Sequence, residues 1–181
     1  MKETFLNLID YIKNPVLEKD LNTDTKYRFK IFLHLLVISI ATGLVISPIF
    51  VILDEIGFVN MDNHKIDEMF KNLSLFQILL TGGIIAPVIE ELIFRAPITS
   101  FKKPASFKIG FYVFAVLFGL VHLTNFDITP NVLIAAPLLV LPQIILGAYF
   151  GFIRVKFGLI WSMLLHGCYN SILMIIGFGF E

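Results

Sequence analysis

Two adjacent glutamates, Glu90 and Glu91, lie inside an apolar stretch that also contains Arg95. A carboxylate at the depth of a bilayer costs several kcal/mol unless it is paired, so such residues are functional candidates by default. Glu91 and Arg95 are four residues apart and share one helical face, where they can form an ion pair. Glu90 is rotated by ~100° from Glu91 and is predicted to be a general base that takes a proton from water. The alternative is a buried ion-pair network that only fixes packing.

Polar residues also interrupt two later apolar stretches, as parts of residue pairs spaced four apart: Phe118 with His122, and His166 with Asn170. Taken singly, either histidine could cap a helix or form a hydrogen bond between helices. Together with Glu90, two imidazoles and an amide are the groups needed to activate water and hold an oxyanion. His166 and Asn170 share one face and could donate to that oxyanion. Phe118 is predicted to be a packing residue.

The composition indicates which elements must position these residues. The chain has 181 residues, of which 57% are apolar and 15% charged, whereas soluble domains carry ~25% charged residues. This favours an all-α, polytopic membrane helix bundle, because a spanning helix needs ~20 mostly apolar residues. Five stretches meet that requirement, at about residues 32–53, 73–98, 107–123, 132–153 and 157–180.

Glycines and prolines cluster near the polar residues. Gly82, Gly83 and Pro87 precede the glutamates, and Pro87 is expected to free the carbonyl of Gly83. Two prolines, at positions 137 and 142, are expected to interrupt the fourth helix. Such breaks need protein groups or water to satisfy the freed backbone. Ordinary bending of spanning helices is the alternative interpretation.

Basic residues predict the orientation, because cytoplasmic loops are enriched in Lys and Arg. They lie in the N-terminal segment and in the loops after the second and fourth helices, whereas the loops at residues 54–72 and 124–131 have few or none. The N-terminus is therefore expected to be cytoplasmic. Residues 1–31 are predicted to be an amphipathic cytoplasmic or interfacial segment, with Phe5, Ile9, Ile12 and Val16 on one face. A short helix packed on the bundle is the open alternative.

These helix ends place Glu90 nearer the cytoplasmic side and His122 nearer the outer side. At ~1.5 Å per residue, His122 lies ~22 Å along its helix from Phe107. A shared site therefore requires a longer second helix, a later start of the third, or tilted helices.

Several chemistries and partners are excluded by absent features. The net charge of zero gives no support for nucleic acid. The single cysteine, Cys168, cannot form an intrachain disulfide and is predicted to be a small packing residue. There is no H-E-x-x-H zinc motif, no G-x-S-x-G around a serine, and no aspartate within the five spans for an aspartyl dyad.

Three motifs occur in order on successive polar helices: E-E-x-x-x-R at residues 90–95, F-x-x-x-H at 118–122 and H-x-x-x-N at 166–170. In this the chain resembles the CPBP family of CAAX prenyl endopeptidases and bacteriocin-processing or immunity proteins, also called Abi. The resemblance covers about residues 73–176 and implies a four-helix catalytic core. It implies a membrane-embedded protease domain at residues 32–181.

The resemblance also implies roles for the polar residues. Glu90 would activate the attacking water and His122 would assist. His166 and Asn170 would stabilise the oxyanion, and Glu91 with Arg95 would orient the site. Members of the family have been described both as metalloproteases and as glutamate proteases. Glu90, His122 and His166 could accordingly hold zinc or act without any metal.

We therefore predict an intramembrane endopeptidase in the plasma membrane of a prokaryote. Its partners would be the lipid bilayer and a peptide or membrane-anchored protein, reaching the site laterally or from the cytoplasmic face. The substrate could be a CAAX-type, leader or bacteriocin-like peptide. One competitor is a non-catalytic immunity or scaffold protein that binds a peptide or a sensor partner. The other is a small transporter that uses Glu90 and Glu91 as a proton relay.

Overall fold

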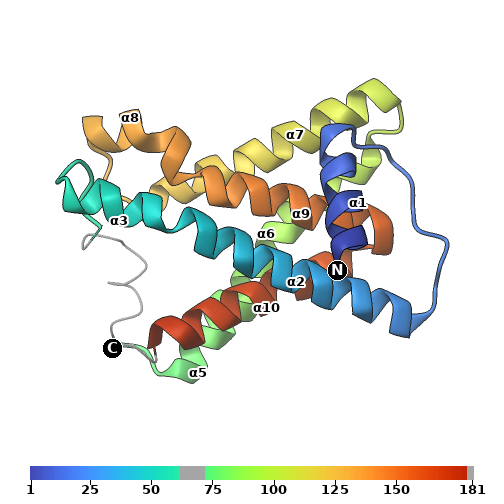
Figure 1. Ribbon diagram of the computed structural model, residues 1–181, viewed down its shortest axis with the longest axis horizontal. Helices are drawn as coiled ribbons and strands as arrows, with labels where there is room; N and C mark the ends of the chain where they lie inside the picture. Colours follow the sequence, from blue (N-terminus) through green and yellow to red (C-terminus); the bar gives the residue numbers. More distant parts are fainter. Residues whose placement is uncertain (62–71, 179–181) are drawn as a thin grey trace.

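The computed structural model describes residues 1–61 and 72–178. Most of the loop at residues 54–72, whose few basic residues entered the orientation prediction, lies outside the described residues. Five helical segments are long and apolar enough to cross a bilayer, and the described residues contain no strand. The prediction of an all-α membrane bundle is confirmed. Figure 1 shows the elements in chain order: α1 (Lys2–Lys13), α2 (Thr25–Ile46), α3 (Pro48–Glu55), α5 (Leu75–Ile78), η1 (Leu79–Ile85), α6 (Ala86–Phe94), η2 (Pro97–Ser100), α7 (Pro104–Val121), η3 (His122–Asn125), α8 (Pro130–Leu139), α9 (Leu141–Phe157) and α10 (Leu159–Phe178).

Prolines divide two of the five spans. In the first span, α2 ends at Ile46 and Pro48 begins α3, where a missing N–H costs nothing. In the fourth span, α8 and α9 meet at Val140 and Pro142 lies in the first turn of α9. Pro137 stays inside α8. The fourth helix is therefore interrupted as expected, but at Pro142 alone.

The second span changes its hydrogen-bonding pattern just before the glutamates. It begins at a capping box of Ser74 and Gln77 and then becomes a π-helix over η1. The N–H of Ala86 accordingly bonds the carbonyl of Thr81, five residues back. In this register the next residue, Pro87, leaves the carbonyl of Gly82 without its helical donor. The sequence prediction, which assumed a regular α-helix, placed the freed carbonyl one residue later, at Gly83.

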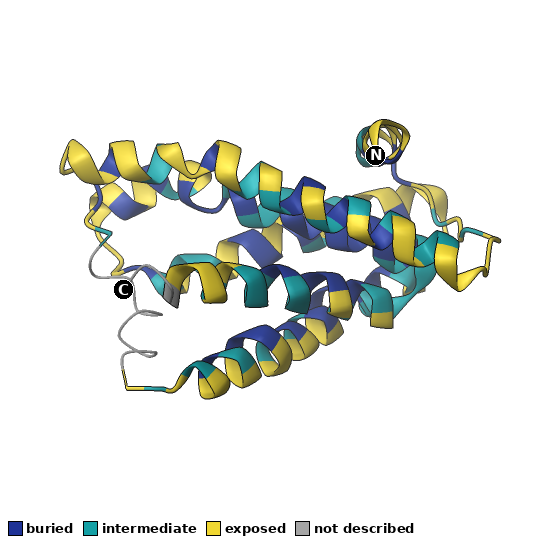
Figure 2. Cartoon of the chain, turned by 60° about the horizontal axis from the view of Figure 1, so that its bottom comes forward, coloured by how far each residue is buried: buried dark blue, intermediate teal, exposed yellow. Residues whose placement is uncertain are grey.

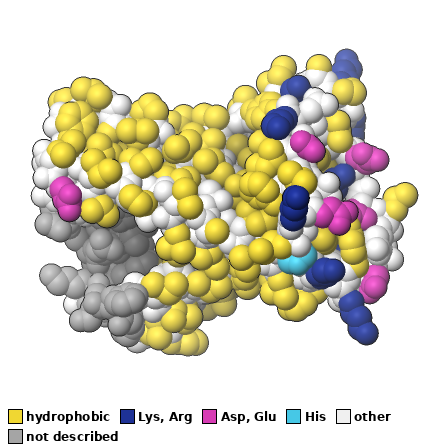
Figure 3. All heavy atoms as spheres, viewed as in Figure 1, with side chains coloured by type: hydrophobic (Ala, Val, Ile, Leu, Met, Phe, Trp, Pro, Cys, Tyr) yellow, Lys and Arg dark blue, Asp and Glu magenta, His cyan; other side chains and the backbone are white. Residues whose placement is uncertain are grey.

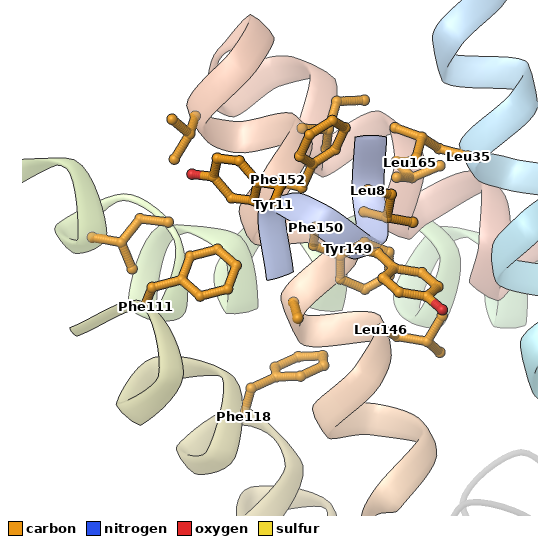
Figure 4. Packing of buried hydrophobic residues seen from close by; sticks show 14 of the residues in the cluster. Leu8, Tyr11, Leu35, Phe111, Phe118, Leu146, Tyr149, Phe150, Phe152 and Leu165 are labelled. Atoms are coloured by element: carbon orange, nitrogen blue, oxygen red, sulfur yellow. The ribbon is translucent and has the colours of Figure 1, made fainter. Parts of the chain in front are cut away.

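The core is built around α9. Every residue from Leu146 to Ile153 is buried, because α9 packs against α7, α10, α2 and α1. Figure 4 shows the aromatic residues of this core, with Phe111 and Phe118 of α7 facing Phe150 and Phe152 of α9. The outer faces of the spans carry the exposed residues (Figure 2), and many of these are large and apolar, as lipid-facing surfaces require.

Helix α1 packs on the bundle and so follows the alternative interpretation of the N-terminal segment. It buries Leu8 and Tyr11 against the core, and the Tyr112 hydroxyl donates to the carbonyls of Ile12 and Lys13 at 2.7 and 3.1 Å. The predicted apolar face docks only in part, because Ile12 packs against the core whereas Phe5 and Val16 are exposed.

Candidate active site

The structure brings the three motifs together at one cavity of about 340 Å³. Glu90 faces it from α6, His122 from the first residue of η3, and Asn170 from α10. The third helix begins at Pro104, earlier than predicted, so a later start does not account for the common depth. The second span instead extends past Pro97 to Ser100, and Figure 1 shows it inclined to α7. These are the other two arrangements that a shared site allows.

Glu91 is completely buried and has three polar partners. Its carboxylate lies 3.6 Å from Nε of Arg95 and 3.1 Å from Nδ1 of His166. The Ser162 hydroxyl donates to its other oxygen. Sequence reasoning did not identify Ser162 as part of the site. The signal was present, because Ser162, His166 and Asn170 follow one another at intervals of four residues and share one face of α10.

His166 lies between the two glutamates. Its Nδ1 faces Glu91, and its Nε2 lies 3.6 Å from Oε2 of Glu90. The ring is stacked on Phe150 with a centroid distance of 4.5 Å, and Phe118 meets its edge at 5.5 Å. Only 3% of the side chain is exposed, whereas 28% of the Glu90 side chain is. The ring is thus held by a stack on one face and by an edge contact, and it links a buried carboxylate to one that faces the cavity.

His122 is held by the turn that ends α7. Its Nδ1 lies 2.8 Å from the carbonyl oxygen of Phe118, and a carbonyl can only accept, so Nδ1 carries the hydrogen. The ring also packs edge-on against Phe118 at 4.8 Å. This leaves Nε2 of His122 as the nitrogen available to accept a proton.

Asn170 closes the break in the second span. Its Nδ2 donates to the carbonyl of Gly82 at 3.1 Å, which is the carbonyl that Pro87 leaves over. The side-chain amide of Asn170 has two N–H groups. One bonds the Gly82 carbonyl of η1, and the other is available at the cavity that Asn170 lines. The predicted oxyanion donor is therefore also a structural link between α10 and η1.

Arg95 is buried against aromatic rings as much as against Glu91. Its guanidinium carbon lies 4.0 Å from the centroid of Phe118, close enough for a cation–π contact. Gly147 of α9 makes room for this stack, because a Cβ there would lie 3.1 Å from both side chains. Phe118 is thus a packing residue, as predicted, and it also stabilises the positive charge.

The three residues named as zinc ligands do not form a set as they stand. Within residues 1–61 and 72–178, no group of three His, Cys, Asp or Glu residues could hold a metal ion. Glu90 and His166 are paired, but His122 would have to move toward them. In both imidazoles, nevertheless, Nδ1 bonds a protein oxygen, the Phe118 carbonyl for His122 and the Glu91 carboxylate for His166, and Nε2 is left for another partner. Metal-binding histidines are held in the same way.

One comparison with known proteins gives a match. Residues 72–172 match the family model described as type II CAAX prenyl endopeptidase Rce1-like. No curated protein and no solved structure matches the chain. The matched region begins before the second span and includes all three motifs, and it leaves out α1 and the first span.

Proposed function

This chain belongs to the Rce1-like family of type II CAAX prenyl endopeptidases, and from that premise we propose that Glu90 activates the water that attacks a peptide bond. The chain is a multi-pass membrane protein of a family of intramembrane endopeptidases. The observation that carries the proposal is the different setting of the two glutamates. Glu91 is enclosed by Arg95, His166 and Ser162, whereas Glu90 faces the cavity.

Glu90 both accepts and returns the proton that hydrolysis moves. Glu90 takes a proton from water while the water oxygen attacks the carbonyl carbon of the substrate. The resulting oxyanion is stabilised by the second N–H of Asn170 and by Nε2–H of the imidazolium form of His166, whose Nδ1–H donates to Glu91. When the intermediate collapses, the C–N bond breaks and the leaving nitrogen takes up a proton from Glu90, assisted by Nε2 of His122. Glu91 and Arg95 hold His166 in place throughout.

Zinc at Glu90, His122 and His166 is the competing form of this proposal. In the described structure these three residues do not gather as a three-ligand set. We expect purified protein to keep its cleavage rate after treatment with a chelator. Loss of cleavage that added zinc restores would instead make the three residues metal ligands.

The cellular setting of the proposal is the plasma membrane of a prokaryote, with the N-terminus in the cytoplasm. The substrate would be a peptide or a membrane-anchored protein, of the CAAX, leader or bacteriocin-like kind. A non-catalytic immunity or scaffold protein would need the fold but no general base at Glu90.

The test is a comparison of protein termini in host cells that carry the wild type, Glu90→Gln or Glu55→Gln at equal abundance in the membrane. Glu55 is exposed at the end of α3 and serves as the control for loss of a carboxylate. We expect a set of cleaved termini to vanish in Glu90→Gln only. Identical termini in all three strains would contradict the protease and favour the non-catalytic binder.

A further inference from the structure

Gln143 of α9 is a polar residue outside the three motifs. Its Oε1 is buried and has no hydrogen-bond partner within residues 1–61 and 72–178. The other glutamine of the chain, Gln77, is placed differently, because its Oε1 accepts from the backbone N–H and the hydroxyl of Ser74 at 2.9 and 2.8 Å. A buried acceptor without a donor destabilises a folded protein, so such atoms are rare and call for an explanation.

The face of α9 that carries Gln143 is the one turned to the active site. Gln143 lies four residues before Gly147 and seven before Phe150, so the three residues share one helical face. Gly147 lies against Phe118, because a Cβ there would be 3.1 Å from that ring. Phe150 is stacked on His166 at a centroid distance of 4.5 Å. Two of the three motifs are therefore in contact with this face.

The same face extends to the end of α9. Arg154, eleven residues after Gln143, donates from Nε to the carbonyl of Arg95 at 3.1 Å and from Nη2 to the Thr99 hydroxyl at 2.9 Å. It thereby holds the end of α6, the helix that carries both glutamates. Gln143 continues this row of site contacts toward the beginning of α9.

Gln143 lies at the depth of the cavity. Helices α7 and α9 run in opposite directions, and Gly119 near the end of α7 meets Ile144 near the start of α9. The side chain of a helical residue leans toward the helix N-terminus, which brings the amide of Gln143 to the depth of His122. Helices α9 and α10 are joined by one residue and also run in opposite directions, so the start of α9 lies beside the half of α10 that carries Asn170. His122 and Asn170 both line the cavity.

A peptide segment in this cavity needs acceptors as well as donors, because each of its residues has a main-chain N–H and a C=O. Hydrophobic side chains cover most of the middle of the visible face (Figure 3), so a segment that enters the membrane leaves water behind. In the proposed reaction Asn170 and His166 donate to the substrate carbonyl, while Glu90 and His122 handle protons. Gln143 adds a neutral acceptor that no protein donor occupies.

We infer that Gln143 is a substrate-binding residue, whose Oε1 accepts a hydrogen bond from a main-chain N–H of the peptide beside the scissile bond. This rests on the proposed function and adds a binding residue to its site. The Gln143 residue as a whole is partly exposed although Oε1 is covered. The terminal torsion of a glutamine is soft, so the amide turns Oε1 to the arriving N–H. The peptide then supplies the partner that Oε1 lacks in the free protein.

The first arm of the test needs no activity. Gln143→Met keeps the size of the side chain and removes its polar atoms. Because Oε1 has no donor in the free protein, we expect an unfolding temperature in detergent equal to or above that of the wild type. Gln77→Met is the matched control, and it should lower the unfolding temperature because the Gln77 Oε1 does have donors. A fall for Gln143→Met as large as for Gln77→Met would make Gln143 a structural residue and overturn the inference.

The second arm measures cleavage of a peptide that spans a terminus lost in Glu90→Gln. We expect Gln143→Met to raise KM about 10-fold with kcat nearly unchanged, because it removes one hydrogen bond made in the bound state. Gln77→Met should keep the wild-type KM. A wild-type KM in Gln143→Met would overturn the inference.

Ester analogues of the same peptide identify the bonded group, because an ester oxygen replaces one main-chain N–H at a time. The wild type should bind one of these analogues about 10-fold more weakly than the peptide, whereas Gln143→Met should bind both alike. Equal losses in the two proteins would contradict the bond to Oε1. The two proposals fail separately. If no terminus depends on Glu90, the protease itself is lost. If Glu90-dependent cleavage exists and Gln143→Met keeps the wild-type KM, the protease stands and Gln143 does not bind its substrate.

Discussion

Glu90 and Glu91 are neighbours in the chain but have different surroundings. A step of one residue turns the helix by ~100°, which directs Glu91 into the core and Glu90 toward the cavity. The buried Glu91 is stabilised by the charge of Arg95 and by hydrogen bonds from His166 and Ser162. A carboxylate with this many partners is suited to holding other groups still, and His166 is the group it holds.

Ser162 offers a direct test of this positioning network. Ser162→Ala removes the hydroxyl that donates to Glu91, and a hydrogen bond to a buried charged group is worth about 1.5–3 kcal/mol. We expect lower thermal stability in detergent and a loss of cleavage of about 10–100-fold, as is typical when a partner that orients a functional side chain is removed. Ser162→Thr keeps the hydroxyl and should restore most of the rate. Wild-type cleavage by Ser162→Ala would show that Glu91 is positioned without it.

At the scale of elements, the site depends on a close crossing of η1 and α10. A Cβ on Gly167 would lie 2.6 Å from the carbonyl oxygen of Gly83. This contact is with backbone, so no rotamer change can relieve it. The same crossing brings Asn170 to the carbonyl of Gly82. Gly167 and Gly83 therefore set the distance between α10, which carries Asn170, and the π-helical segment η1.

Gly167→Ala is expected to push α10 away from η1. Overpacking of this kind costs about 1–3 kcal/mol, and here it should also lengthen the bond between Asn170 and Gly82. We expect a lower unfolding temperature together with a loss of cleavage. Gly177→Ala, on the same helix, has nothing within 4 Å of the added Cβ and is the matched control. Equal behaviour of the two variants would contradict the role of the crossing.

The sequence predicts elements better than it predicts their interruptions. Runs of apolar residues locate all five spans, because the need to bury backbone polar groups in lipid acts on each segment separately. The π-helical register of η1 is not local in this sense. Its carbonyl at Gly82 bonds Asn170, which lies 88 residues away in the chain. The motifs predict Glu90, His122 and His166 as site residues from local spacing alone. The contacts that Phe150, Gly147 and Arg154 make around them come from other elements and required the folded structure.

At the scale of the molecule, α1 is part of the bundle. The sequence alone left it open between a surface helix and a packed one, because its apolar residues cover more than one face. The structure shows the reason for this ambiguity. Leu8 is fully buried against the core, and Thr4 and His34 share a hydrogen bond of 2.8 Å. Phe5 and Leu6 stay exposed on the other side, where a membrane interface would accommodate them.

Leu8→Ala tests whether this docking stabilises the whole protein. Truncating a buried leucine costs about 2–5 kcal/mol, and Leu8 belongs to the same core as α9 and the aromatic rings behind the candidate active site. We therefore expect a clear fall in the unfolding temperature of the full chain, measured in detergent. Leu6→Ala removes the same atoms from an exposed position, 49% accessible, and should leave the unfolding temperature nearly unchanged. If both variants unfold at the wild-type temperature, α1 rests on the bundle without stabilising it, and the fold depends on the five spans alone.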